Sequence, residues 1–327
     1  MNCPKWTLAS GDYDRVRALW DGSLKPERFD LNVTLLSPDI IFSRMVNEGA
    51  FELSEMSLST YVILKSRNRV PFIAIPVFPS RKFRHGDIYV RADSALHSLS
   101  QLRGKRVGVP EYQLTAFVWI RGLLQDEYGI AATDMSWRVG GLDVPGRKEK
   151  VPIQLPDAFD VCSIPATDTL NDLLLAGEID AIFSPSAPKG FQTGEIRHLL
   201  PDYVKEERAF YQRTHVFPII HTVVLRSDIY EAYPDAAWEL YQLYQTAKDL
   251  CFKRYAARMA LAVSIPWFDA AVDDAKSLMG RDFWAYGVKN NRKELLLFLR
   301  YMHQQGMIPD SFQPSPESLF ARETQST

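Results

Sequence analysis

The feature that most constrains the fold of this chain is a regular alternation of short apolar runs with amphipathic runs of helical period. WTLAS at 6–10 has the composition of a strand, and after the turn GDYD a helical run places Val16, Leu19 and Trp20 on one face. The apolar runs LNVTLLS, FELSEMS and VPFIAIPVF continue the series, with helical runs around 40–46 and 61–65 between them. This alternation is typical of an α/β protein whose sheets are mostly parallel.

The series begins again after residue 94, which predicts a second lobe. LRGKRVGVP reads as a strand, TAFVWIRGLLQDEYG as a helix closed by Gly129, and TLNDLLLAGEIDAIFSP as a helix, with Thr169 and Asp172 at capping-box spacing, followed by a strand. VFPIIHTVVLRSD is a long apolar strand, and helical patterns dominate the remainder. The region 140–160 reads as a loop or hairpin without a motif of its own.

We therefore expect an α/β clamshell of two lobes. Lobe I comprises 1–90 and 216–327, which includes the C-terminal helices, and lobe II comprises 91–215. Two extended crossover segments, 86–94 and 216–226, would join the lobes. Ligands of such proteins bind in the cleft, where strand ends and helix N-termini converge.

Composition and charge exclude several classes of protein. The 38 basic and 40 acidic side chains give a net charge of -2, so the chain has no overall field that would attract nucleic acid. Cys3, Cys162 and Cys251 lack the spacing of a disulfide framework or a zinc site. The N-terminal stretch lacks the apolar run of about 7 to 15 residues of an export signal, and no stretch approaches the roughly 18 apolar residues of a membrane span. We expect a cytoplasmic protein that binds neither nucleic acid nor membrane.

A basic cluster lies in FPSRKFRHGDIYV, where an apolar strand meets the first crossover. Arg81, Lys82, Arg84 and His85 fall within five consecutive positions. A guanidinium can hold a carboxylate through two parallel hydrogen bonds, and an imidazole can give or take a proton near neutral pH. The cluster therefore predicts a carboxylate site beside a proton-transfer group, although a solvated turn with a surface histidine would have the same sequence.

A second histidine, His221, interrupts the apolar run VFPIIHTVV. A lone histidine in such a run is commonly a hydrogen-bonded core residue. Its place on the second crossover would instead bring it toward the cleft opposite His85, so we include it as a catalytic candidate.

The stretch PEYQLTAFVWIRG places Glu111, Tyr112, Gln113 and Thr115 at the entrance to a helix. The free N–H groups of a helix N-terminus favour an anion, so these side chains are candidates for substrate binding. Glu111 is either a general base or an acid that complements the helix dipole.

Two further turns supply substrate-binding candidates. SEMSLSTY offers Glu55, Ser57 and Ser59, whose hydroxyls could bind a carboxylate or phenol, although one serine could simply cap the next helix. The turn GDYD contributes Asp12.

Metal ligands are not indicated by local spacing. His85, Asp87, Glu111 and His221 could in principle meet at an ion, but no HExxH-like pattern joins them. We expect neither a metal nor an organic cofactor.

Several motifs together resemble the 4,5-dihydroxyphthalate decarboxylase family, whose fold is similar to that of type II periplasmic solute-binding proteins. They are GDYDRVRALWDG, SEMSLSTY, IPVFPSRKFRHGDIYV, LRGKRVGVPEYQLTAFVWIRGLLQDEYG, GEIDAIFSP, FPIIHTVV and DFWAYGVKNNRKEL. The similarity runs from about residue 6 to residue 320, and the run 75–128 is its most specific part. In one departure the chain reads RHGDIYV where the family pattern is RHSAIYV, so Asp87 adds a carboxylate beside the candidate site.

The resemblance implies a homo-oligomeric enzyme of aromatic compound catabolism that converts 4,5-dihydroxyphthalate to protocatechuate and CO2 in phthalate degradation. Arg81 and Arg84 would hold the carboxylates of the small aromatic substrate, and His85 would act as acid and base with Glu111 and His221 in support. Two alternatives remain: a solute-binding protein for an aromatic carboxylate, and another cytoplasmic enzyme of the same fold acting on a small carboxylated metabolite.

Overall fold

The chain divides into two units in the computed structural model, which describes residues 3–68 and 70–327. The first unit contains the residues up to Arg81, together with Ile219–Leu296 and Gln313–Thr327. The second contains Lys82–Pro218 and Leu297–Phe312. The sequence placed the boundaries at 90/91 and 215/216 and assigned 297–312 to the first lobe. The structure places them at 81/82 and 218/219, because the segment after Arg81 leads into a strand that pairs within the second sheet.

The first unit is built on a mixed sheet. Its strands in the described part of the chain are β1 (Lys5–Ser10), β2 (Asp30–Leu35), β3 (Leu53–Ser57), β4 (Phe72–Arg81) and β11 (Ile219–Arg226). They lie in the order β2-β1-β3-β11-β4. β1 is parallel to β2 and β3, whereas β11 is antiparallel to both β3 and β4. All five residues of β3 are buried, as expected of a central strand.

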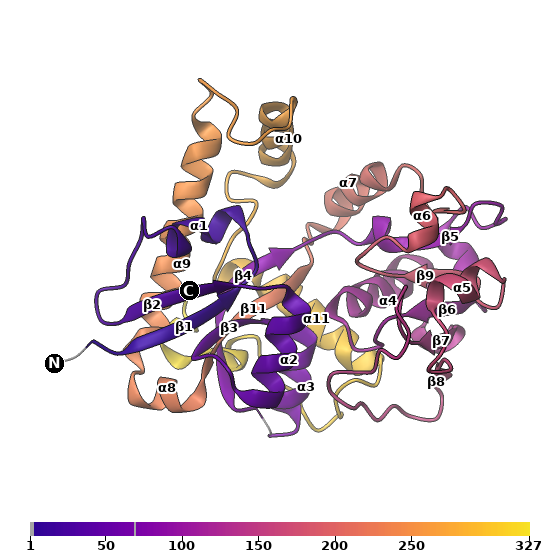
Figure 1. The fold of residues 1–327 in the computed structure, drawn as a ribbon, viewed down its shortest axis with the longest axis horizontal. Coiled ribbons are helices and arrows are strands. Elements are labelled where there is room, and N and C mark those ends of the chain that lie inside the picture. Colours follow the sequence, from indigo (N-terminus) through magenta and orange to yellow (C-terminus); the bar gives the residue numbers. More distant parts are fainter. Residues whose placement is uncertain (1–2, 69) are drawn as a thin grey trace. The chain divides into compact units, whose positions relative to one another are not determined.

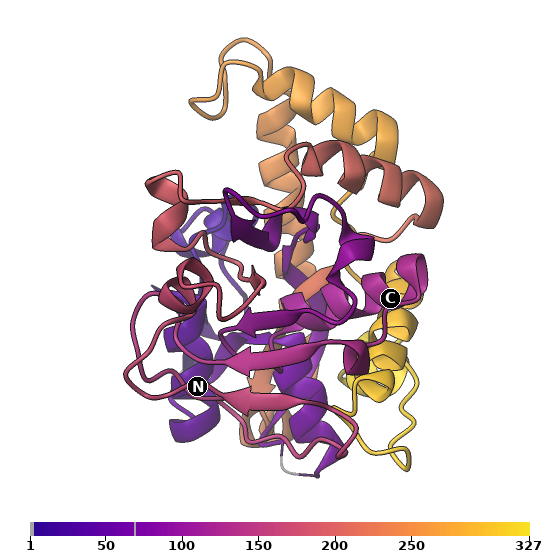
Figure 2. The same cartoon turned by 90° about the vertical axis from the view of Figure 1, so that its right-hand side faces the viewer.

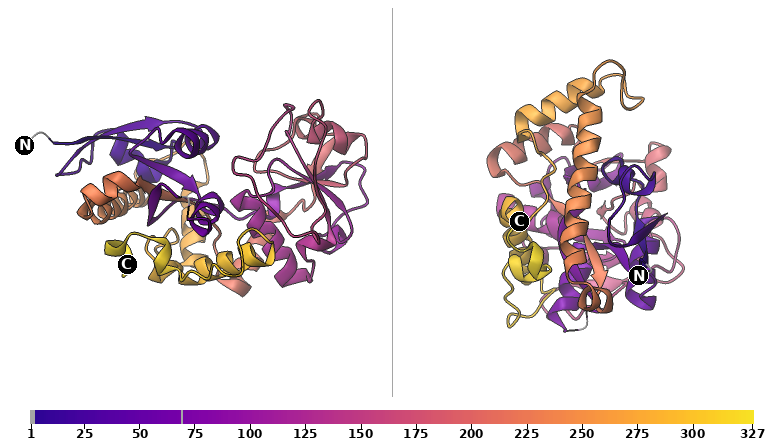
Figure 3. Two further views of the ribbon diagram at one scale, coloured as in Figure 1. Left: turned by 90° about the horizontal axis from the view of Figure 1, so that it is seen from below. Right: turned by 90° about the vertical axis from the view of Figure 1, so that its left-hand side faces the viewer.

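Helices surround this sheet. They are α1 (Arg17–Trp20), α2 (Pro38–Glu48), α3 (Leu58–Ser66), α8 (Ser227–Ala232), α9 (Asp235–Ala256) and α10 (Phe268–Met279), with the 3-10 turns η1 (Asp14–Val16), η5 (Lys289–Asn291), η6 (Glu317–Leu319) and η7 (Arg322–Thr324). α2 begins at a proline, whose missing N–H costs nothing at a helix start, and ends at Gly49 in the left-handed conformation, with φ of 59°. Figures 1 and 3 show α9 running past the sheet to the loop that precedes α10.

The second unit has a mixed sheet of its own, whose strands are seen side by side in Figure 2. Within the described residues they are β5 (Ile88–Arg91), β6 (Arg106–Val109), β7 (Ser136–Val139), β8 (Val161–Ser163), β9 (Ala181–Phe183) and β10 (Ile196–His198). The order is β10-β5-β9-β6-β7-β8. β9, β6, β7 and β8 are parallel, and β5 is antiparallel to β9 and β10.

The helices of the second unit are α4 (Thr115–Tyr128), α5 (Leu170–Leu175), α6 (Lys189–Gln192) and α7 (Tyr203–Thr214), with the 3-10 turns η2 (His85–Asp87), η3 (Leu99–Leu102) and η4 (Ala132–Asp134). Two of them, α4 and α5, follow predicted start and stop signals, whereas α6 and α7 lie in a stretch for which the sequence predicted no helix. α11 (Arg292–Gln304) begins in the first unit and continues into the second. Gly129 ends α4 in the left-handed conformation, and the Thr169 hydroxyl caps α5 by accepting the Asp172 N–H at 3.1 Å. None of the helices described in the structure is long and apolar enough to cross a bilayer.

A fully buried arginine links α4 to the C-terminal part of the second unit. The Arg121 guanidinium donates from Nε to Gln305 Oε1 at 2.7 Å and from Nη2 to the Tyr112 carbonyl at 2.8 Å. Its carbon lies 3.9 Å from the centre of the Tyr112 ring. Burial lowers the pKa of Arg121. An arginine this deep is tolerated because amide, carbonyl and ring face replace part of its hydration.

Gly122, the next residue in α4, lies against the ring of Tyr301, and a Cβ atom at this position would overlap that ring. The ring cannot easily move away, because its hydroxyl donates to Asp126 at 2.5 Å and its face meets Trp119 edge-on. We expect Gly122→Ala to destabilise the protein by about 1–3 kcal/mol, although alanine favours an isolated helix over glycine by about 1 kcal/mol.

Thermal or urea unfolding measures this loss, with Gln125→Ala in the same helix as the control. A Gly122→Ala variant as stable as the Gln125→Ala variant would show that the close packing of α4 on Tyr301 is not needed.

Candidate active site

Polar side chains gather at one edge of the first unit's sheet, where β3 and β4 end and the antiparallel β11 begins. The register places His221 opposite both Ser57 of β3 and Ser80 of β4, and Ile219 opposite Arg81. Because β11 runs against its neighbours, its first residues share an edge with their last ones. This edge therefore collects candidates that are far apart in the sequence.

Glu55 and His221 form a hydrogen-bonded pair at this edge. His221 Nδ1 lies 2.9 Å from Glu55 Oε2, and the two side chains are only 12% and 1% exposed. A carboxylate beside Nδ1 favours the tautomer that carries its proton there, and this leaves Nε2 as the nitrogen that can exchange a proton with a ligand. Phe42 meets the imidazole edge-on, with ring centres 4.9 Å apart, and so limits its rotation.

Two further donors hold the Glu55 carboxylate. The Gly11 backbone N–H, just after β1, donates to Oε1, and the Tyr13 hydroxyl donates to Oε2 at 3.2 Å. Burial, and then the charge of Glu55, raise the pKa of Tyr13 well above its usual range, so its hydroxyl keeps the proton that it donates. The sequence placed Glu55 among substrate-binding residues, whereas its position behind His221 suits orientation of that histidine.

The remaining candidates from these turns are Ser57, at the start of α3, and Asp12, just after β1. Ser57 caps α3, with its hydroxyl 3.5 Å from the Thr60 N–H, and lies 3.0 Å from the hydroxyl of Ser59. The capping alternative for this serine is therefore observed. Asp12 is exposed at the turn after β1.

Arg81, at the end of β4, has a buried side chain held by an amide. Its Nη2 donates to Asn291 Oδ1, and the residue is 7% exposed. The guanidinium carbon lies 5.6 Å from the centre of the Phe78 ring. The sequence did not single out Asn291, which is 210 positions away from Arg81.

The rest of the basic cluster belongs to the second unit, where one carboxylate binds two of its cations. Asp87 accepts from Arg84 Nη1 at 2.6 Å and from Lys82 Nζ at 2.8 Å. The Asp87 and Arg84 side chains are 3% and 7% exposed, whereas that of Lys82 is 53% exposed. The added carboxylate in RHGDIYV thus neutralises charge within the cluster.

His85 is buried in the second unit, 6% exposed, and its ring centre lies 5.3 Å from that of Phe210. Burial, and then the nearby Arg213 cation, lower the pKa of His85 to about 4. Its Nδ1 has no hydrogen-bond partner among the residues that the structure describes. The ring is therefore neutral at neutral pH and is a weaker base than an exposed imidazole.

Glu111 is held by cations from the region 140–160 that the sequence left without a motif. Arg147 donates to Glu111 Oε1 from Nε at 3.0 Å and from Nη2 at 2.6 Å, and the Lys150 ammonium also contacts this oxygen. The Lys150 backbone N–H donates to Oε2 at 3.1 Å. The one available signal was the alternating charge in GRKEK.

The remaining candidates at the entrance to α4 are core residues of the second unit. Tyr112 is 0% exposed, Gln113 1% and Thr115 2%. Gln113 donates to the Val151 carbonyl at 3.1 Å, and Glu149 accepts the Tyr112 N–H. Burial raises the pKa of Glu149 to about 7. The structure thus gives these residues packing contacts that the sequence did not suggest.

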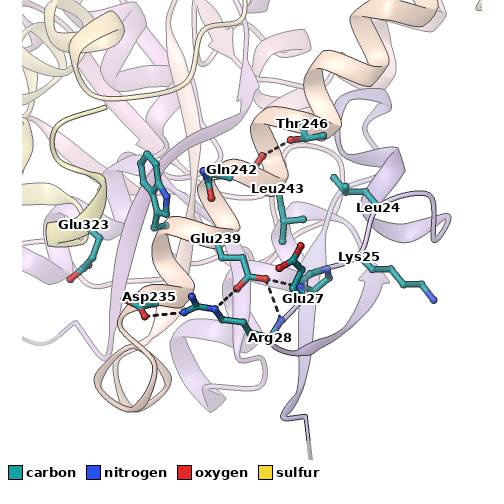
Figure 4. Close-up of a pocket in the computed structure, with 12 residues that line it drawn as sticks. Leu24, Lys25, Glu27, Arg28, Asp235, Glu239, Gln242, Leu243, Thr246 and Glu323 are labelled. Atoms are coloured by element: carbon teal, nitrogen blue, oxygen red, sulfur yellow. Dashed lines mark hydrogen bonds and ion pairs between the residues drawn. The ribbon is translucent and has the colours of Figure 1, made fainter.

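Among the described residues, the candidates form no metal-binding cluster, and none of them lines the hollow that lies beside α9. Across residues 3–68 and 70–327, no group of three or more His, Cys, Asp or Glu side chains could hold an ion. A hollow of about 630 Å³ lies between residues 24–28 and α9, where Glu239 accepts the Glu27 N–H at 2.8 Å (Figure 4). None of the predicted site residues lines it.

Solved structures and a family model agree on the fold. A protein from Archaeoglobus fulgidus superposes with a TM-score of 0.54 at 13% identity, covering 94% of this chain and 100% of that one. The ligand-binding component of an ABC-type import system from Staphylococcus aureus gives 0.51 at 12% identity, covering 99% and 98%. Residues 41–150 match the model of the family described as ABC transporter, phosphonate, periplasmic substrate-binding protein. The predicted binding-protein-like α/β fold is confirmed.

Two sequence relatives are much closer. A 4,5-dihydroxyphthalate decarboxylase of Comamonas testosteroni is 38% identical over 311 residues, which cover 94% of each chain. A 4,5-dihydroxyphthalate decarboxylase of Pseudomonas putida is 42% identical over 194 residues, which cover 59% of this chain and 75% of that protein. The predicted family is confirmed: this chain belongs to the 4,5-dihydroxyphthalate decarboxylase family of carboxy-lyases, built on the fold of periplasmic solute-binding proteins.

Proposed function

We propose that this chain decarboxylates 4,5-dihydroxyphthalate to protocatechuate and CO2 in phthalate degradation. The names of its relatives supply the substrate. The structural observation that carries the proposal is the buried Glu55–His221 pair, at the same sheet edge of the first unit as Arg81. A receptor that only binds an aromatic acid would have no use for an oriented proton-transfer pair.

The reaction requires a proton donor and fixed carboxylates. In 4,5-dihydroxyphthalate each carboxylate is para to one hydroxyl, so loss of a phenolic proton places electron density on the carbon that carries the carboxylate. Protonation of that carbon forms a C–H bond. The bond to the carboxylate then breaks, CO2 leaves, and the electron pair restores the aromatic ring. One proton replaces one CO2, and no oxidant or reductant is consumed.

His221 is the general acid of this proposal. Glu55 accepts the Nδ1 proton, so Nε2 of the imidazolium can deliver a proton to the ring carbon. Glu55 is a positioning residue, because it acts through the imidazole and is itself held by Gly11 and Tyr13.

Arg81 is the first carboxylate anchor, and Arg84 ranks second because Asp87 already accepts from its guanidinium. His85 and Glu111 keep supporting roles. Both belong to the second unit, where burial keeps the His85 ring neutral and Arg147 and Lys150 hold Glu111 in place.

The direct experiment is to incubate the purified protein with 4,5-dihydroxyphthalate and to follow CO2 and protocatechuate together. We expect equal amounts of both products. Phthalate lacks the para hydroxyls and should bind without reacting. Binding of 4,5-dihydroxyphthalate without turnover would overturn the proposal in favour of a solute-binding protein, and turnover of only another carboxylated metabolite would favour a different enzyme of this fold.

Replacement of single histidines separates the two candidate acids. We expect His221→Asn to lower kcat by roughly 10²-fold or more, with phthalate affinity largely retained, because asparagine keeps much of the size but cannot transfer a proton. Glu55→Gln should lower kcat by a smaller factor, because it keeps the hydrogen-bond geometry and removes only the charge that stabilises the imidazolium.

The matched comparison is His85→Asn, with His97→Asn as an exposed control. A neutral His85 should contribute less than His221 and should give no break in the rate near pH 7. A large loss of kcat in His85→Asn, together with an almost unchanged His221→Asn variant, would transfer the acid role to His85.

We also propose a cytoplasmic location and a homo-oligomer, as the family resemblance implies. Of the aromatic side chains of α9, Trp238 is 41% exposed, whereas Tyr244 is 1% exposed and belongs to the core, so it cannot lie in an interface. The loop between α9 and α10 offers more apolar surface, because Met259, Ile265 and Trp267 are 103%, 57% and 77% exposed.

Light scattering tests the oligomer. We expect a native mass that is a multiple of the 37.3 kDa chain, and a smaller mass for Trp267→Ser. A monomer at micromolar concentration would contradict the oligomer without affecting the proposed reaction.

A further inference from the structure

We propose that Asn291 is a positioning residue for substrate binding, which orients the guanidinium of Arg81 without neutralising its charge. The inference rests on the proposed function in one respect, because it takes Arg81 to bind a substrate carboxylate. Asn291 lies within the motif DFWAYGVKNNRKEL, but the sequence assigned it no role and the relatives' names indicate none.

The amide of Asn291 has its orientation fixed by three hydrogen bonds. Nδ2 donates to the Ala285 carbonyl at 3.0 Å and to the Gly287 carbonyl at 2.7 Å, while Oδ1 accepts from Arg81 Nη2. Two carbonyls on the nitrogen side leave only the oxygen to face the guanidinium, so the reversed amide would set donors against donors and acceptors against acceptors. With 1% exposure, the side chain has little room for another rotamer.

The segment that carries these carbonyls is itself fastened to β4, the strand that carries Arg81. The Gly287 N–H donates to the Pro76 carbonyl at 2.8 Å, and Trp284 Nε1 donates to the Phe78 carbonyl at 2.9 Å. Gly287 has a φ of 93°, a conformation that favours glycine. The Asn291 oxygen and the Arg81 guanidinium are therefore held to a common strand of the first unit.

The Asn291 amide carries no charge, and this bears on how Arg81 binds an anion. A neutral amide oxygen can fix the direction of a guanidinium, but it adds no negative charge that would compete with a substrate carboxylate. Arg84 shows the other arrangement, because its close partner is the carboxylate of Asp87 at 2.6 Å. An amide partner does not offset the charge of an arginine that binds an anion, whereas the carboxylate partner of Arg84 does.

The test is a double-mutant cycle of Arg81→Ala and Asn291→Ala, read out as the dissociation constant of phthalate and as KM and kcat. We expect Asn291→Ala to weaken phthalate binding and to raise KM by roughly 10-fold, with kcat much less affected. In the Arg81→Ala background the same substitution should have almost no further effect on binding, because Asn291 acts through Arg81. Asn290→Ala, at the exposed neighbouring position, should change neither constant.

A charged variant tests the need for a neutral partner. Asn291→Asp should weaken phthalate binding relative to wild type at the same pH, and the deficit should shrink as the pH falls and the introduced carboxyl becomes neutral. Asn291→Ala should show no such recovery. If Asn291→Ala does not fold, as judged by its melting curve, Asn291→Ser replaces it in the cycle.

The outcomes separate this inference from its premise. Unchanged phthalate binding in Arg81→Ala would remove Arg81 as an anchor and the inference with it, whereas decarboxylation by the wild type would still support the proposed reaction. Weakened binding in Arg81→Ala but not in Asn291→Ala would overturn the inference alone. An equal loss from Asn291→Ala in both backgrounds would make Asn291 a purely structural residue.

Discussion

The carboxylate of Glu55 lies inside the first unit with 1% exposure, and a charge removed so completely from water requires hydrogen-bond donors on its oxygens. The donors come from the turn after β1 and from β11. Strands β1 and β11 both pair with β3, so the sheet order itself brings the donors to the carboxylate. The direction of the His221 ring, and hence the proposed proton transfer, depends on this arrangement.

The two units use charge differently. In the second unit Arg84 is neutralised by Asp87, and Glu111 by Arg147 and Lys150, so these ions stabilise turns and a helix entrance. In the first unit the buried ionisable groups at the sheet edge have partners that orient them: Glu55 directs His221, and Asn291 directs Arg81. A site that binds a dianion and transfers a proton needs side chains held in a fixed direction more than it needs their charges neutralised by ion pairs.

The sequence predicted the α/β class and many elements, because hydrophobic periodicity and caps are local. Gly129 and Thr169 lie where the stop and start signals placed them. The partner of each charged group could not be predicted in the same way. Glu55 and His221 are 166 positions apart, and their contact depends on strand order, which local patterns do not specify. For the same reason the first predicted boundary fell late: the pairing of β5 with β9 and β10, and not its apolar composition, assigns it to the second unit.

The guanidinium of Arg121 has a consequence for the order in which the chain can fold. Its amide partner, Gln305, is 184 positions later, in the segment 297–312 that completes the second unit. During synthesis on the ribosome, residues 82–218 emerge long before this partner and before Tyr301, against which Gly122 packs. In a nascent second unit the Arg121 guanidinium therefore lacks this amide partner until residue 305 has been made. Final packing of this unit therefore waits for residues 297–312, although its described strands are complete in the chain by residue 198.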